Sequence, residues 1–190
     1  MRNPVMTATA AALGAAFALP AAADLGPCGE IDDDTLYSAV MGHYESQDFP
    51  GTVTAEGMGT QPAGASGDIE SVVFWMDGDD LVASSATGGA DFHIDFERAE
   101  GGDVLGQYFD GPSPGPMDSD EIEVLMECDM DDVPRLVGTA QVTVPEGEMD
   151  LTLDLLFLGD VGMHGVMQWE TVQQGRHIAI RKPVTLTPEH

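Results

Sequence analysis

Met163, His164 and Met167 lie close together along the chain and are among the side chains that could hold a metal ion. Thioether sulfur and imidazole nitrogen both suit copper, so a copper site is one hypothesis. However, successive residues of a β-strand face opposite sides, which places the two methionines on one face and His164 on the other. We therefore expect the methionines to pack in a core and to bind no metal.

Acidic residues are the second candidate for chemistry. The runs Asp77-Gly78-Asp79-Asp80 and Asp129-Met130-Asp131-Asp132 carry enough oxygen ligands for calcium, but neither has the spacing of an EF-hand loop. His93 and Asp95 share one face of an expected strand, where they could bind a metal or act as acid and base. A solvated strand face explains the same pattern. We therefore predict no catalytic residue and no metal ligand.

Motifs of common enzymes do not occur in the sequence. There is no H-E-x-x-H, G-x-S-x-G or C-x-x-C motif, no phosphate-binding loop and no dinucleotide fingerprint. Hydrolases and redox enzymes that depend on these motifs are disfavoured. We expect no cofactor, and the sequence favours a non-enzymatic role.

The most regular pattern lies between Val137 and Leu186. Four segments with alternating apolar and polar residues are separated by three short breaks, which predicts four consecutive antiparallel strands. The apolar faces match if the loops contain four residues at 145–148, three at 159–161 and two at Gln174-Gly175. Lys182 places a charge on the apolar face beside a proline, which predicts a bulge or a sheet edge there.

The last of these turns makes a specific prediction about register. A two-residue turn at Gln174-Gly175 places Trp169 opposite Ile180 and Met163 opposite Leu186. Both apolar sets then share one face of the sheet, so the register is consistent with the hydrophobic pattern.

The first half of the chain is less regular. Leu36 and Val40 have helical spacing after an acidic run, which predicts a short helix through about Val40. Apolar alternation predicts strands at 52–55, 71–76, 81–83, 92–96 and 104–109, with a loop over the rest of 51–67. At 122–128 alternation favours a strand, while capping by Ser119 or Asp120 leaves a short helix as the alternative.

These elements predict an all-β domain of about ten strands in an antiparallel up-and-down meander with one short N-terminal helix. The meander could close as a barrel or pack as a two-sheet β-sandwich. The short helix followed by Gly42-His43-Tyr44 resembles the entry to lipocalin-like barrels, where a Gly-x-aromatic motif opens the first strand. The resemblance implies a barrel rather than a sandwich.

Inward-facing apolar residues of such a barrel are the remaining candidate for a binding site. They are Phe92, Ile94, Phe96, Leu151, Leu153, Met163, Met167, Trp169 and Ile180. Pattern alone leaves open whether these side chains fill the interior or line a cavity. Gly165 and the neighbouring methionines would leave room for an apolar ligand, so we predict ligand binding at these residues.

The start of the chain indicates export. Residues 1–23 combine one basic residue, an apolar run and small residues before Asp24, which predicts a secretory signal peptide. Residues 24–190 then form a single domain of a periplasmic or secreted protein, without a transmembrane segment. In an exported chain the two cysteines, Cys28 and Cys128, are expected to form a disulfide, with two buried free thiols as the alternative.

The sequence has 34 Asp and Glu residues against 6 Lys and Arg residues, a formal net charge of −28. Nucleic acids and anionic lipid surfaces are therefore not expected as partners, because both are polyanions. We predict an exported, non-enzymatic β-barrel that binds a small hydrophobic ligand or a partner protein. The alternatives are a cation-binding or structural envelope protein, and an enzyme with an unrecognised carboxylate site.

Overall fold

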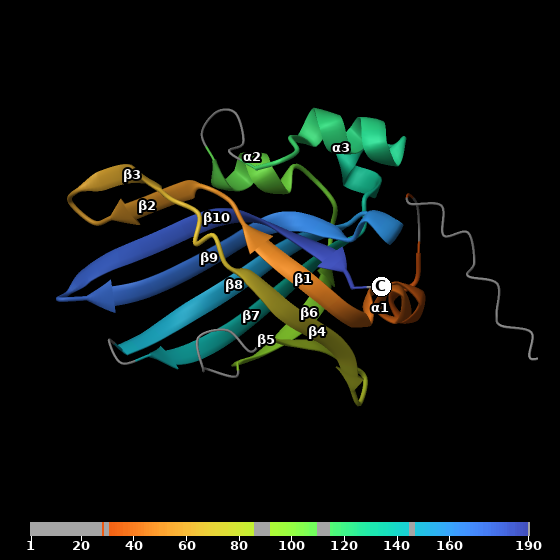
Figure 1. The fold of residues 1–190 in the computed structure, drawn as a ribbon, viewed down its shortest axis with the longest axis horizontal. Coiled ribbons are helices and arrows are strands. Elements are labelled where there is room, and N and C mark those ends of the chain that lie inside the picture. The colour runs from red at the N-terminus through yellow and green to blue at the C-terminus, as the bar shows by residue number, and fades with distance from the viewer. Residues whose placement is uncertain (1–27, 29–30, 86–91, 110–114, 145–146, 190) are drawn as a thin grey trace, which may run out of the picture.

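Eight antiparallel strands close into a barrel in this protein, whose structure is a computed structural model (Figure 1). The structure describes residues 28, 31–85, 92–109, 115–144 and 147–189, so the predicted signal peptide at 1–23 lies outside it. In sheet order the barrel strands are β1 (Gly42–Asp48), β4 (Ile69–Asp77), β5 (Asp80–Ser85), β6 (Phe92–Ala99), β7 (Arg135–Val144), β8 (Gly147–Phe157), β9 (Met163–Gln173) and β10 (Arg176–Pro188). Because β1 pairs with both β4 and β10, the sheet closes. The predicted all-β barrel is confirmed.

A hairpin of two further strands, β2 (Gly51–Ala55) and β3 (Gly59–Ala63), extends the sheet beyond the barrel (Figure 1). β1 pairs with β10 as far as Asp48 opposite Val184, and β2 continues alongside β10 from Thr52 opposite Arg181. β3 pairs with β2 on its outer side. The loop predicted for the β3 segment is wrong. Most of its side chains are exposed, so it has no buried face and no apolar alternation.

The predicted register of the last hairpin is confirmed. Trp169 lies opposite Ile180, and Met163 lies opposite Leu186. Gln174-Gly175 forms the turn with φ values of 54° and 76°, and two residues with positive φ are what a type I′ hairpin turn requires. The turn therefore fixes the faces of both strands.

The two other predicted loops of this region differ in outcome. Between β8 and β9 the register is the one that a three-residue loop at Gly159–Val161 predicts. The four-residue loop at 145–148 is wrong, because Val142 rather than Val144 lies opposite Met149. Since this shift is by two residues, every side chain keeps its predicted face. Residues 145 and 146 themselves lie outside the described residues.

Two segments that alternation predicted as strands are helices, α2 (Val104–Tyr108) and α3 (Ser119–Met126). α3 begins with a capping box. The Asp118 carboxylate accepts the backbone N–H of Glu121 at 2.9 Å, and the Glu121 carboxylate accepts the backbone N–H of Asp118 at 3.0 Å. Helix was the alternative for this segment, but its cap is Asp118 rather than Ser119 or Asp120.

α1 (Asp33–Val40) is the predicted short helix, and it lies at the end of the barrel where β1 begins (Figure 1). The Asp32 side chain caps it by accepting the backbone N–H of Thr35 at 3.0 Å. Leu36 and Val40 are fully buried and join the core inside the barrel. We call this the closed end. The far end is the opposite one, where β1 and β9 finish and β10 begins.

A helical cap covers the outer face of β8 and β9. It consists of α2, α3 and the 3₁₀ helix η2 (Met130–Asp132). Apolar side chains of the cap and of the residues next to it pack against outward-facing residues of the barrel and form a second core with them. The cap side contributes Val104, Leu105, Phe109, Ile122, Met126, Met130 and Val133, and the barrel side contributes Leu156, Leu158 and Val166. Strands that alternation would leave half solvated are thus buried on both faces where the cap lies.

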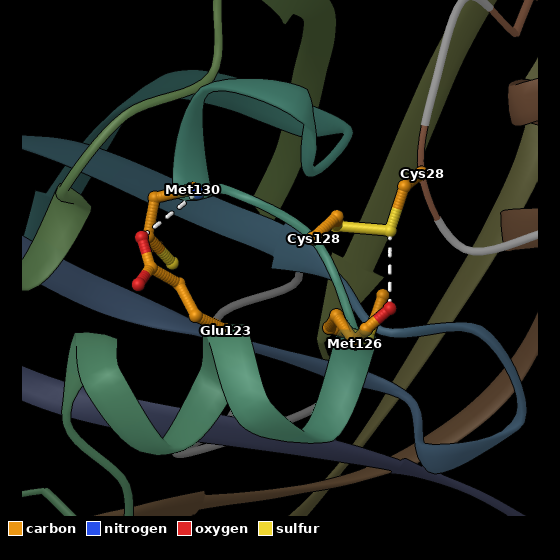
Figure 2. The surroundings of a disulfide bond; sticks show 5 residues. All are labelled: Cys28, Glu123, Met126, Cys128 and Met130. Carbon is orange, nitrogen blue, oxygen red and sulfur yellow. Dashed lines mark hydrogen bonds between the residues drawn. A yellow bond between two sulfur atoms is a disulfide. The ribbon is translucent and has the colours of Figure 1, made fainter.

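The disulfide between Cys28 and Cys128 fastens the N-terminal segment to this cap, which confirms the predicted pairing (Figure 2). The Cys28 sulfur lies 3.1 Å from the Met126 carbonyl oxygen. A disulfide sulfur has no proton to donate, so this is a close contact rather than a hydrogen bond. Nearby, the Glu123 carboxylate accepts the backbone N–H of Met130 at 3.2 Å and joins α3 to η2 (Figure 2).

Replacement of both cysteines by serine tests the contribution of the bridge. The two residues are 100 apart in sequence, so we expect the free energy of unfolding to fall by about 4 kcal/mol as the unfolded chain gains conformational freedom. Urea unfolding followed by circular dichroism measures the loss. A change below about 1 kcal/mol would contradict the chain-entropy explanation.

Candidate functional site

The residues predicted to face the barrel interior lie at different depths. Ile94, Phe96, Leu151, Leu153 and Met163 are buried in the interior core. Met167 and Trp169 are partly buried and pack against that core, and Ile180 is also partly buried. Phe92 belongs to β6, but its side chain lies outside the described part of the structure.

The interior toward the closed end is filled by side chains. The ring of Phe74 lies 5.4 Å from that of Tyr44 and 5.2 Å from that of Phe96, measured between centroids. A Cβ at Gly138 would come within 2.5 Å of the Phe96 ring and 2.7 Å of Ile94, so even a methyl group would not fit there. Any ligand inside the barrel would therefore have to bind nearer the far end.

The far end has a different character. Met167, Trp169 and Ile180, which we call the far-end group, face the interior but are only partly buried. Trp169 lies between Leu151 on β8 and Ile180 on β10. Val53 of β2 lies opposite Ile180 and extends the same apolar face beyond the barrel. Apolar side chains of the interior are thus within reach of solvent at this end.

A charged pair lies beside the far-end group. Lys182 is opposite Met167 on the inward face of β10, and its ammonium forms an ion pair with Asp48 of β1. Their side chains are only 16% and 7% exposed. Ser66, between β3 and β4, donates its backbone N–H to both Asp48 oxygens, at 2.9 and 3.0 Å, and its hydroxyl to Oδ1 at 2.6 Å.

The hydrogen bonds to Asp48 decide its charge. Burial alone would raise the pKa of Asp48, but the bonds from Lys182 and Ser66 outweigh it, so the pKa lies below its ordinary value. Asp48 is therefore ionised at neutral pH. Its pairing could not be read from the sequence, since the two residues are 134 apart.

A bulge or a sheet edge was predicted at Lys182, and the strand pairing of β10 is interrupted there along one of its two edges only. Toward β9 the ladder is unbroken, with Pro183 opposite Val166. On the other side β10 changes partner, from β1 at Val184 to β2 at Arg181, and Lys182 and Pro183 occupy the changeover. Proline fits there because a missing N–H costs least where the ladder is interrupted.

The methionine and histidine residues do not meet. Met163 is buried in the interior core, whereas His164 lies on the outer face beneath the cap, as alternation predicts. Within the described residues, no group of three or more His, Cys, Asp or Glu side chains could hold a metal ion. The same part of the chain contains no helix long and apolar enough to cross a membrane.

His93 and Asp95 lie on the solvent-facing side of the barrel. Nε2 of His93 is 3.6 Å from Oδ1 of Asp95, and both side chains are substantially exposed. The imidazole ring packs edge-on against Trp75, with centroids 5.4 Å apart. These contacts are those of a solvated strand face.

A buried polar cluster under α2 was not found from the sequence. Asp154 of β8 is 1% exposed, and its two oxygens accept hydrogen bonds from Arg135 at 2.7 and 2.6 Å. The hydroxyl of Tyr108 donates to the same carboxylate at 3.1 Å. Arg135 also donates to the side chain of Gln107 at 3.2 Å. The cluster fastens α2 to the barrel, and its groups satisfy one another.

The charges of this cluster reinforce it. Burial raises the pKa of Tyr108 to about 12, and the neighbouring Asp154 carboxylate adds to the effect. Hydrogen bonding to Asp154 raises the pKa of Arg135. Tyr108 therefore keeps its proton and Arg135 its charge, and neither acts as an acid or base near neutral pH. The sequence carries one indication that this part of the barrel is covered on its outer side. Residues 155–158 are apolar on both faces of the strand, which a solvated outer face would not require.

His164 is the other buried polar residue beneath the cap. Its side chain is fully buried, and Nε2 lies 3.3 Å from the Met117 carbonyl oxygen. Nδ1 makes no hydrogen bond of good geometry among the described residues. Burial lowers the pKa of His164, opposed in part by the backbone groups of Met117 and Val184. The ring is thus neutral at neutral pH.

An acidic cleft of about 650 Å³ lies near the closed end, between the start of α1 and η2. Its lining includes Asp33, Arg98, Glu100, Asp131 and Asp132. Arg98 bonds to Asp33 at 3.2 Å and to the Ile31 carbonyl, so the one basic group of the lining already has partners. The cleft is mainly a solvated, charged surface.

Comparison with protein-family models, with curated proteins and with solved structures finds no match to this chain.

Replacement of Asp154 by leucine tests the buried cluster. It leaves the largely buried charge of Arg135 unpaired, so we expect a loss of about 3 to 5 kcal/mol in the free energy of unfolding. The double variant Asp154→Leu with Arg135→Met removes both charges and should recover part of that loss. Urea unfolding measures both, and equal losses in the single and double variants would argue against a charge effect.

His164 should make stability depend on pH. Its folded-state pKa is below the unfolded value of about 6.5, so the unfolded chain takes up the proton first on acidification. This contribution is complete above about pH 6.5 and is lost as the pH falls through the folded pKa, by at most about 1.4 kcal/mol per pH unit. Urea unfolding at pH 7.5, 6.5 and 5.5 should show a shallower dependence for His164→Phe than for wild type. The exposed-site control His93→Gln should keep the wild-type dependence, and identical curves for all three proteins would refute the assignment.

Proposed function

We propose that this protein is an exported, non-enzymatic β-barrel that binds a small hydrophobic molecule at the far end of the barrel. The observation that carries the proposal is the partial exposure of inward-facing apolar residues at that end, the far-end group. Most inward-facing residues toward the closed end, such as Phe74, Phe96 and Leu155, are buried instead. An eight-stranded barrel is wide enough either to be filled by side chains or to hold one small ligand. In this barrel side chains fill the interior toward the closed end, and we propose that the far end holds the ligand.

The energetics limit the affinity. Burial of a methylene group contributes about 0.8 kcal/mol, so six to ten buried methylenes contribute about 5 to 8 kcal/mol. The costs of association and ordering are subtracted from this. Because 8 kcal/mol alone would correspond to a dissociation constant of about 1 μM, we expect dissociation constants closer to the millimolar range for a simple alkyl chain.

The exported location rests on two observations. Residues 1–23 have the layout of a signal peptide. The Cys28–Cys128 disulfide is compatible with an oxidising compartment such as the periplasm or the extracellular space. The resemblance of the N-terminal helix and Gly42-His43-Tyr44 to the entry of lipocalin-like barrels supports the ligand-binding role by analogy of fold.

The two tryptophans allow a direct test, because the chain has only Trp75 and Trp169. Trp75→Phe leaves Trp169, at the far end, as the single emitter. Trp169→Phe leaves Trp75, which packs against His93 on the outer face. We expect the neutral apolar probe N-phenyl-1-naphthylamine to quench the emission of Trp75→Phe by energy transfer in a saturable way.

The Trp169→Phe variant is the control for surface adsorption of the probe. Its emission should change less at saturating probe, because Trp75 packs against His93 on the outer face of the barrel and away from the far-end group. Absence of probe binding up to the solubility limit, or equal titrations of the two variants, would sink the proposal.

A further inference from the structure

Lys182 is a basic residue that faces the barrel interior near the far end. It lies opposite Met167 and diagonal to Trp169 on the β9–β10 ladder, a separation that long side chains can bridge. Its side chain is 16% exposed, so its ammonium is largely removed from bulk water. A ligand that contacts Met167 therefore also meets the Lys182 side chain, whose ammonium lies at Asp48 of β1.

The hydrogen-bonding capacity of the pair is unequal. The four contacts to the Asp48 carboxylate, three from Ser66 and one from Lys182, occupy both of its oxygens. A lysine ammonium has three N–H donors, and within the described part of the chain Lys182 uses one of them, toward Asp48. Two N–H donors of Lys182 are thus available to an acceptor on a ligand.

We infer that the far end takes an uncharged, lipid-like molecule whose head group carries an oxygen acceptor, and that Lys182 Nζ donates a hydrogen bond to that oxygen. This inference rests on the ligand-binding function proposed above and specifies its ligand class, which includes long-chain alcohols and esters. The alkyl chain contacts Met167, Trp169 and Ile180, and the oxygen lies at Lys182.

The fixed position of Asp48 disfavours an anionic head group. A ligand carboxylate within hydrogen-bond distance of Lys182 would also lie close to the Asp48 carboxylate, so repulsion offsets much of the attraction. The cost of removing the ligand carboxylate from water then remains uncompensated. Asp48 is held by Ser66 as well as by Lys182, so it is not free to swing away. The net charge of −28 adds a further, screened repulsion.

A cationic head group is disfavoured for the complementary reason. It would meet the Lys182 ammonium, and both Asp48 oxygens are already occupied. A neutral oxygen avoids both penalties, since it accepts an N–H from a charged donor without introducing a second charge. A hydrocarbon without any acceptor would cover the two N–H donors and leave them unsatisfied.

The test compares three ligands with the same chain, 1-dodecanol, dodecanoate and dodecylammonium. Each competes with N-phenyl-1-naphthylamine for Trp75→Phe, followed by Trp169 emission at pH 8, where dodecanoate is ionised. We expect 1-dodecanol to displace the probe at about tenfold lower concentration than either ion, the factor expected for one hydrogen bond from a charged donor.

Two variants reverse or remove this preference. Asp48→Asn, made in the Trp75→Phe background, leaves Lys182 as an uncompensated cation beside an amide that Ser66 can still hold. Dodecanoate should then gain about tenfold relative to 1-dodecanol. Asp48→Asn combined with Lys182→Met removes both charges, so no unpaired buried charge remains, and should reduce the advantage of 1-dodecanol over dodecylammonium, because the repulsion by Lys182 and the hydrogen bond that it donates are both lost.

The outcomes separate this inference from the function on which it rests. If the probe does not bind Trp75→Phe, the proposed ligand-binding function itself fails. If the probe binds and the three ligands compete equally, or dodecanoate is preferred in the Asp48 protein, binding stands but the inference is overturned. The comparison on Trp75→Phe needs no change at Asp48 or Lys182, so it remains decisive even if a variant at these positions does not fold.

Discussion

The structure depends on the pairing of β1 with β10, which closes the sheet into a barrel. Five consecutive residue pairs join these strands, from Tyr44 opposite Pro188 to Asp48 opposite Val184. Closure gives the protein an inside, and with it the distinction between inward and outward residues on every strand. It also makes the two ends unequal, because α1 precedes β1 directly and packs into the end where that strand begins. The candidate site is the end that α1 leaves uncovered.

Much of the fold could be predicted because the second half of the chain consists of hairpins with short turns. In such hairpins a positive-φ pair such as Gln174-Gly175 fixes the register locally, and alternation fixes the faces. Alternation failed at α3, where the apolar residues Ile122 and Met126 are compatible with a period of two as well as with a helical turn. β3 was not predicted, because a strand without a buried face has no alternation of apolar and polar residues.

The candidate site could be predicted only as a list of inward-facing residues. Which of them remain accessible depends on the position of α1 and on the packing of Phe74, Phe96 and Gly138, which are far apart in sequence. The pairing of Lys182 with Asp48 depends on barrel closure, and the burial of Asp154 and His164 depends on the cap. Local sequence patterns carry little information on contacts of this kind, because the partners meet only when distant segments pack together.

β3 has a further consequence for the behaviour of the protein at high concentration. Among the described strands it is the last in the sheet order, with β2 as its one neighbour, so its outer backbone groups are where a strand of another copy could add. Pro62 interrupts that edge by removing a donor, and β3 has only five residues. Mutual repulsion between copies that each carry a net charge of −28 opposes the same contact. The hairpin that widens the apolar face of the barrel is thus also built to resist polymerisation through its own edge.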